Sequence, residues 1–248
     1  MKFIPIALSA ALFSLCAIPF ANAKEPAKEL AGEPSVHSYV LLDRTGSMSD
    51  IWSEALSSVN AYAEGLSALD DGKTIDTDIT LAVFDSQDGL QFDVIRDNAT
   101  PGTWRKVTSA DASPRGMTPL YDAIGRIVAM AEQDAPSKAV IVIMTDGREN
   151  SSKETTRDGA KAALERARAK GWEVVFLGAE FSNFDDAEGV GQSKSRNMAV
   201  AKEQLSQTMG TLAQKSRDYA AGASATVEFN DQDRSEAKEE DVKQRTNR

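Results

Sequence analysis

The sequence contains little of the chemistry on which most enzymes and disulfide-bonded proteins depend. Its 248 residues include one cysteine, Cys16, and one histidine, His37. Cys16 lies in an N-terminal apolar segment, so the chain that remains after loss of that segment has no thiol. Disulfides, thiolate catalysis and cysteine-ligated zinc are therefore excluded, and a lone histidine removes most catalytic triads and the usual zinc sites.

The sequence also lacks an excess of basic charge. Its formal net charge is −10, which argues against nucleic acid or an anionic membrane surface as the main partner. After residue 23, no apolar stretch is long enough to cross a membrane.

The first 23 residues have the layout of a bacterial secretory signal peptide. Lys2 gives a positive start, residues 3–20 are mostly apolar, and residues 21–23 form an A-x-A cleavage site before the polar Lys24. Leu15 is too large for the small residue that precedes the cysteine of a lipoprotein site. We therefore expect an exported protein, periplasmic or secreted, whose mature chain begins at Lys24.

Short apolar runs suggest the strands of a sheet. Runs rich in β-branched residues suit strands that are buried on both faces of a parallel sheet. They occupy residues 39–42, 139–144 and 174–177, and a further strand is expected at about 198–200. Residues 80–84 and 90–95 flank a turn at 86–89, which predicts a hairpin and one antiparallel edge strand.

Helical patterns lie between these runs. One apolar face comprises Ile51, Ala55, Val59, Tyr62 and Leu66, and a second comprises Leu120, Ala123, Ile124, Ile127 and Met130. A third helix is expected from about 153 to 170, before Gly171 at the position where a left-handed residue is wanted, and a last one from about 202 to 221. This alternation predicts a doubly wound α/β fold with a mostly parallel sheet and helices on both faces.

The chain accordingly divides into four parts. Residues 1–23 are the signal peptide, 24–34 a linker, 35–222 the α/β domain and 223–248 a tail. Beyond Phe229 the tail is almost wholly charged and polar. It cannot bury enough apolar surface to fold alone, which predicts disorder.

Oxygen-bearing side chains stand at the ends of three separate segments. Asp43, Thr45 and Ser47 follow the first strand, Asp146 follows a later one, and Thr118 precedes a helix. In a doubly wound sheet these ends share one edge, where ligands bind. Two carboxylates and three hydroxyls make a hard site for one divalent cation, Mg²⁺ first, with Mn²⁺ or Ca²⁺ as alternatives. Neutral hydroxyls leave much of the ion's charge uncompensated, so it would accept a further carboxylate.

These five residues, in this order and on these elements, resemble the metal-ion-dependent adhesion site of von Willebrand factor type A domains. The resemblance extends over roughly residues 35–221. It implies a metal ion at the top of the sheet that Ser47 and, in the ligand-ready state, Thr118 coordinate directly. Thr45 stands where the usual pattern has Ser, which keeps the hydroxyl and adds a methyl group.

Each of the three segments also has an ordinary explanation. Thr118 before Pro119 suits a helix N-cap with proline at the first helical position, and Asp43 and Asp146 could merely end strands. All three explanations must hold together and still reproduce the family's order. The joint pattern therefore favours the metal site.

A recognition rim around the ion is a further hypothesis, made of Trp104, Arg115 and Met117. Trp104 lies in a long polar segment where no core pattern demands an indole, and tryptophan often anchors interfaces. The alternative is that Trp104 plugs the side of the domain.

The leading functional interpretation is a non-enzymatic binding module whose ion grips an Asp or Glu of a partner protein. One alternative is a metal-dependent hydrolase of a phosphorylated or acidic substrate, although the ligands have no general base beside them. Another is a structural envelope subunit whose ion only stabilises the fold.

Overall fold

The computed structural model describes residues 36–68 and 75–246. The expected signal peptide and linker, residues 1–34, lie outside the described residues. Within the described part, no helix is both long and apolar enough to span a membrane.

Six strands form a single sheet in the order β3-β2-β1-β4-β5-β6. The strands are β1 (Val36–Asp43), β2 (Thr77–Ser86), β3 (Leu90–Ala99), β4 (Ala139–Thr145), β5 (Glu173–Ala179) and β6 (Asn197–Val200). Strand β1 pairs in parallel with both β2 and β4, and the parallel pairing continues through β5 to β6. Only β3 is antiparallel, at one edge. The predicted fold class, with its hairpin and edge strand, is confirmed.

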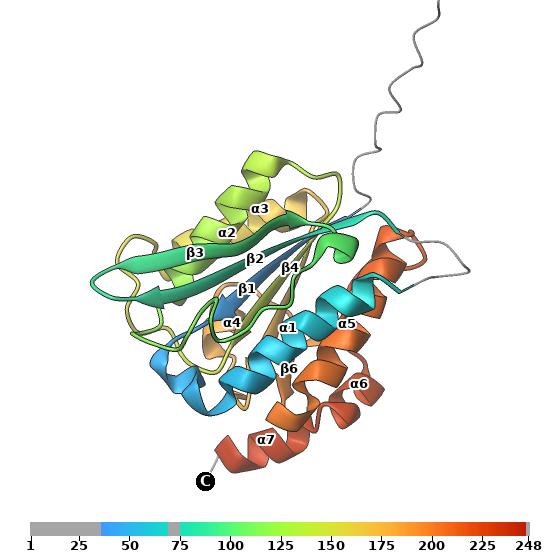
Figure 1. Cartoon of the computed structure of the whole chain (residues 1–248). Coiled ribbons are helices and arrows are strands. Elements are labelled where there is room, and N and C mark those ends of the chain that lie inside the picture. Colours follow the sequence, from blue (N-terminus) through green and yellow to red (C-terminus); the bar gives the residue numbers. More distant parts are fainter. Residues whose placement is uncertain (1–35, 69–74, 247–248) are drawn as a thin grey trace, which may run out of the picture. The chain divides into compact units, whose positions relative to one another are not determined.

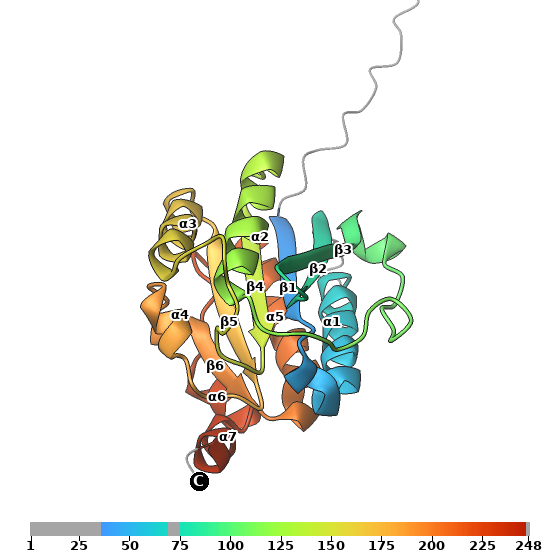
Figure 2. The same cartoon turned by 90° about the vertical axis from the view of Figure 1, so that its left-hand side faces the viewer.

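Helices cover both faces of this sheet (Figures 1 and 2). The helices are α1 (Trp52–Leu66), α2 (Leu120–Asp134), α3 (Arg157–Ala169), α4 (Asp185–Gly189), α5 (Leu205–Ala220), α6 (Asp231–Glu236) and α7 (Glu239–Thr246). Helices α1 and α5 pack against one face, and α2 and α3 against the other. Each face of the sheet has its own apolar core, because residues of each strand alternate between the two sides.

The apolar faces expected from the sequence are the ones that the helices bury. All five residues of the first set are buried, and so are four of the second, while Met130 packs partly buried against the same core. Gly171 ends α3 with φ +80°, as its position predicted. Helix α3 begins at Arg157, later than expected, because the Thr156 hydroxyl caps it by accepting from the Gly159 N–H.

The strand order creates a switch point at the centre of the sheet. The chain runs from β1 to β2 on one side and later returns to β4 on the other, so β1 and β4 are neighbours. Their carboxyl ends lie at one edge, where doubly wound folds bind ligands. Asp43 ends β1, and Asp146 follows the last residue of β4.

The C-terminal segment corrects the sequence prediction. Residues expected to form a disordered tail instead include α6 and α7, which lie against β6 (Figure 1). Val227, Phe229, Ala237 and Val242 are buried. The segment has too little apolar surface to fold alone, but it buries these four side chains against the rest of the domain.

The segment also covers part of the free edge of β6. The N–H of Ala201 donates to the carbonyl of Ala237 (3.0 Å), and the N–H of Ala199 donates to Glu239 Oε1 (3.2 Å). An uncovered edge strand exposes unpaired backbone groups. The C-terminal segment thus covers an edge of the sheet and contributes to the core.

Candidate metal-binding site

The structure brings all five predicted ligands into one hydrogen-bonded cluster. The Ser47 hydroxyl donates to Asp146 Oδ1 (2.8 Å) and lies 3.1 Å from the Thr45 hydroxyl. The Thr118 hydroxyl donates to Thr45 Oγ1 (3.4 Å), and the Thr45 N–H donates to Asp43 Oδ1 (2.7 Å). Side chains from positions 43 to 146 therefore meet at one point.

Burial and hydrogen bonding fix the position of Asp43 in the cluster. It is fully buried at the end of β1, and the Thr145 hydroxyl donates to its second oxygen, Oδ2, over 2.6 Å. The chain then turns into a short 3-10 helix, Gly46–Ile51, with Thr45 at its N-cap. This turn brings the Ser47 hydroxyl to Thr45 and Asp146 and leaves Ser47 exposed.

The two carboxylates have no cationic partner among the described side chains, because no ion pair there involves Asp43 or Asp146. Burial raises the pKa of Asp43 to about 7, although hydrogen bonds from Thr145 and Thr45 act in the opposite direction. Burial also raises the pKa of Asp146. A buried anion of this kind is stabilised by a bound cation.

The nearest basic residue in the sequence, Arg44, is already engaged elsewhere. Its guanidinium binds Asp85 (2.5 Å), which is fully buried, and Asp93 (2.6 Å) of the β2–β3 hairpin. Arg115 reaches the same Asp85 carboxylate over 3.0 Å. These ion pairs hold the hairpin against the loop of the site and leave its anions uncompensated.

Backbone hydrogen bonds clamp the segment that carries Thr118. Arg115 N–H donates to the Arg44 carbonyl (2.8 Å), and Ser86 and Met117 exchange two bonds of 2.9 and 3.2 Å. Gly116 permits this approach because its φ is +70° and a Cβ there would lie 2.4 Å from the Ser86 carbonyl oxygen.

The Thr118 side chain is free to serve the cluster because other groups cap α2. The N-cap of α2 is Pro119, and it makes no side-chain capping bond. Instead, Tyr121 N–H donates to Glu149 Oε2 (3.0 Å), and Asp122 N–H donates to Ser152 Oγ (3.1 Å). The ordinary explanation of Thr118 as an N-cap is therefore wrong.

A hollow of about 420 Å³ opens beside the cluster. Ser47 and Asp146 line one side of it, so the exposed end of the cluster faces this space. The other walls include Glu180 at the end of β5, Lys202 before α5 and Arg245 of α7. Arg245 forms an ion pair with Glu180 (3.0 Å). A carboxylate-sized group has room here next to Ser47 and Asp146.

The three residues of the hypothetical rim have different positions. Met117 is 53% exposed next to Thr118, and the Arg115 side chain is 42% exposed. Trp104 instead packs against the core beside α1, where its indole N–H donates to Asn60 Oδ1 (3.0 Å). It is absent from the lining of the hollow. The structure supports the alternative that Trp104 plugs the side of the domain.

Several positioning residues were not found from the sequence. Thr145 orients Asp43, and Asn150 holds Thr118 by accepting from its N–H (2.8 Å) and donating its own N–H to the Thr118 carbonyl (3.0 Å). For Thr145 the sequence offers one signal of this role, since Thr145 stands directly before Asp146 at the end of a strand. Asn150 has no such signal, because its role depends on a loop that folds back onto α2.

The family model of the von Willebrand factor type A domain matches residues 39–217. The chain belongs to this family. The match includes all five residues of the cluster and most of the sheet. A search of curated proteins found none with a significant match.

Solved structures share the type A fold with this domain. The pilus adhesin SpaC of Lactobacillus rhamnosus GG, in an open conformation, matches with a TM-score of 0.58, 13% identity and coverage of 74% of this chain and 30% of that one. The tip protein Mfa5 of type V pili from Porphyromonas gingivalis gives 0.57 and 10%, with 81% and 99% covered. Proximal thread matrix protein 1 from the mussel byssus, with a zinc-occupied adhesion motif, gives 0.52 and 14%, with 73% and 48% covered.

At these identities the likeness concerns the fold. The chain spans about half or less of the thread matrix protein and of SpaC. What those longer proteins do as a whole therefore does not transfer with the fold.

The cluster itself fits a divalent cation. A Cβ added to Gly147 would lie 3.5 Å from Thr118 Oγ1 and 3.7 Å from Ser47 Oγ, so the glycine leaves open the space between these two hydroxyls. The available donors are carboxylate and hydroxyl oxygens, which hard cations prefer. In the described part of the chain, no group of three or more His, Cys, Asp or Glu side chains offers a rival site.

Proposed function

We propose that this chain is an exported protein-binding module that takes up one divalent cation, Mg²⁺ first, and uses it to grip an acidic side chain of a partner. The observation that carries the proposal is the joining of two carboxylates to three hydroxyls at the sheet edge without a balancing cationic side chain among the described residues. The zinc-occupied adhesion motif named for the mussel thread protein supports uptake of a divalent ion at such a site.

The protein's own residues prepare the site before any partner arrives. Asp43 is held at both oxygens, by the Thr45 N–H and the Thr145 hydroxyl. Thr118 is held through its backbone by Asn150. A cation bound there supplies an electrophilic position for a partner carboxylate, since most of the surrounding donors are neutral. Such preorganisation favours tight binding because few groups must be ordered on association.

Binding is favoured over hydrolysis because, among the described residues, no Asp, Glu or His from outside the cluster hydrogen-bonds to it as a general base would. The single histidine lies on β1 six residues before Asp43, about 20 Å away at the usual rise per residue of a strand. Among the described residues, the side chains outside the cluster that hydrogen-bond to it are the Thr145 hydroxyl and the Asn150 amide. A hydrolase would need a group that accepts a proton from water within hydrogen-bond reach.

Specificity would come from the surroundings of the cluster. The exposed Met117 offers an apolar contact beside Thr118. Across the hollow, Lys202 and Arg245 offer positive charge close to Glu180. Replacement of Met117 by Ser should therefore weaken partner binding without changing metal affinity, because its side chain is absent from the hydrogen-bonded cluster.

A pull-down from envelope extract with the immobilised full chain tests the proposal. We expect a captured partner to be lost on chelation and in Ser47→Ala, which removes an exposed hydroxyl that donates to Asp146. Ser49→Ala is the matched control, since Ser49 is also exposed but its hydroxyl donates to the Gly46 carbonyl.

A partner retained both under chelation and in Ser47→Ala would refute the proposal. If chelation lowered only the melting temperature while the partner stayed bound, the ion would have the stabilising role of the structural alternative. Turnover of generic phosphoesters would favour the hydrolase.

A further inference from the structure

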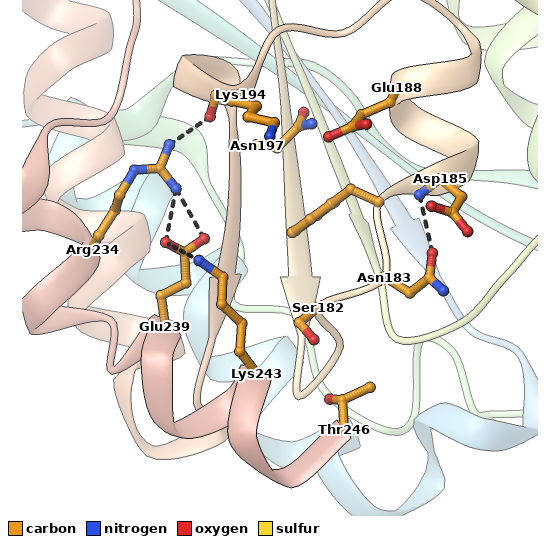
Figure 3. Close-up of a pocket in the computed structure, with 11 residues that line it drawn as sticks. Ser182, Asn183, Asp185, Glu188, Lys194, Asn197, Arg234, Glu239, Lys243 and Thr246 are labelled. Carbon is orange, nitrogen blue, oxygen red and sulfur yellow. Dashed lines mark hydrogen bonds and ion pairs between the residues drawn. The ribbon is translucent and has the colours of Figure 1, made fainter. Parts of the chain in front are cut away.

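A second hollow lies between α4 and the C-terminal helices (Figure 3). Its volume is about 500 Å³, which is within the usual range of small-molecule sites. The segment 182–188 and residues at the start of β6 form one side, and side chains of α6 and α7 form the other. It shares no lining residue with the hollow beside the five-residue cluster.

The wall of this hollow contains a buried amide without a partner. Asn197, the first residue of β6, is 3% exposed, and neither its Oδ1 nor its Nδ2 has a hydrogen-bond partner among the described residues. An unpaired buried polar group destabilises a fold, and an apolar side chain of similar size would avoid that loss. The amide therefore offers one donor group and one acceptor to whatever occupies the hollow.

Two opposite charges flank this amide. Figure 3 shows the ammonium of Lys194 and the carboxylate of Glu188 at the same end of the hollow as Asn197. Within the described part of the chain, neither charge forms an ion pair, and none joins the two. A positive and a negative group thus remain available on either side of a donor and an acceptor.

The other charged side chains of the hollow are already engaged in ion pairs. Arg234 and Lys243 both bind the buried Glu239, at 2.9 and 3.1 Å. Asp185 forms an ion pair with Arg148 over 2.7 Å. Among the described residues that line the hollow, the charged side chains without an ion pair are therefore one cation and one anion, which matches a ligand that carries both signs.

We propose that this hollow binds a small zwitterion, such as an amino acid or a short peptide. Lys194 and the Asn197 Nδ2 hold its carboxylate, and Glu188 and the Asn197 Oδ1 hold its ammonium group. A simple anion would leave Glu188 unmatched, and a simple cation would leave Lys194 unmatched. Recognition therefore requires both charges on one molecule.

Nitrogen-15 NMR of the full chain provides a direct test, because the side-chain NH₂ of Asn197 reports on its own hydrogen bonding. We expect glycine or glycylglycine to shift this signal to saturation. The comparison of the two separates an amino-acid site from a peptide site. Acetate and methylammonium should each bind about tenfold more weakly or worse, because each loses a charge-assisted contact.

Three variants sharpen this test when binding is measured by calorimetry. Lys194→Gln and Glu188→Gln change exposed residues and should each weaken binding of the zwitterion about tenfold. Asn197→Leu should abolish binding and raise the melting temperature. Lys161→Gln is the matched control and should leave affinity unchanged, since Lys161 pairs with Glu165 on α3 and does not line the hollow.

The proposal is overturned if neither zwitterion gives a saturable shift up to roughly 10 mM, ten times the Kd of a weak millimolar site. Equal binding of acetate, methylammonium and glycine would also overturn it. So would unchanged affinity in both Lys194→Gln and Glu188→Gln. Binding should persist in Ser47→Ala and under chelation, so failure here is separate from failure of the metal site.

Discussion

Replacement of Gly116 by Ala should damage both stability and metal binding through a single close contact. The new Cβ would lie 2.4 Å from the Ser86 carbonyl oxygen. Alanine at φ +70° loses about 1–2 kcal/mol from backbone strain alone. Separation of the Ser86–Met117 bridge removes two hydrogen bonds, which adds about 2 kcal/mol. The free energy of unfolding should thus fall by about 3–4 kcal/mol.

Gly222→Ala is the matched control for this prediction. Gly222 has φ +75°, but no atom lies within 4 Å of the place that a Cβ would occupy there. Its loss should be confined to strain, about 1–2 kcal/mol in urea unfolding. Because Thr118 is two residues from Gly116, Mn²⁺ affinity should fall in Gly116→Ala and stay constant in Gly222→Ala. Equal stability losses, or unchanged Mn²⁺ affinity in Gly116→Ala, would refute the reasoning.

Three further predictions concern parts of the fold away from the ligands. Trp104→Ala should lower the free energy of unfolding by about 2–3 kcal/mol in urea and leave partner affinity unchanged, because the indole packs on the core and binds Asn60. Val242→Ala should lower stability by about 1–2 kcal/mol and speed hydrogen exchange of the Ala199 amide, which depends on the docked α7. Burial lowers the pKa of His37 from 6.5 to about 4, so the folded state binds fewer protons than the unfolded one between these values. The free energy of unfolding should therefore be highest above pH 6.5, where the ring is neutral in both states, and should decrease by about 3 kcal/mol as pH falls to 4. Urea unfolding measured at several pH values should show this decrease in the wild-type chain and not in His37→Phe.

The sheet and the cluster could be predicted because their signals are local. Buried parallel strands are continuous apolar runs, and α1 and α2 show their core faces at helical spacing. Once the strand order is inferred, the ends of β1 and β4 must share an edge. Asp43, Ser47 and Asp146 then converge for a topological reason, and the structure joins them as expected.

The remaining features depend on contacts that no local pattern records. The charged segment after Phe229 is a poor candidate for independent folding, yet Ala237 and Val242 dock against β6 because its edge needs a cover. That docking also places Arg245 in the wall of the hollow beside the five-residue cluster. Trp104 was ambiguous for a related reason, since its neighbour Asn60 is 44 residues away.

Calorimetric titration of the full chain with Mg²⁺ and Mn²⁺ examines the role of the five-residue cluster. The wild-type chain and Ser49→Ala should each bind one ion. Ser47→Ala should bind it at least about tenfold more weakly, because it loses the hydroxyl oxygen that lies next to Thr45 and Asp146. Absence of binding to the wild-type chain, or equal affinity in Ser47→Ala and Ser49→Ala, would contradict the account.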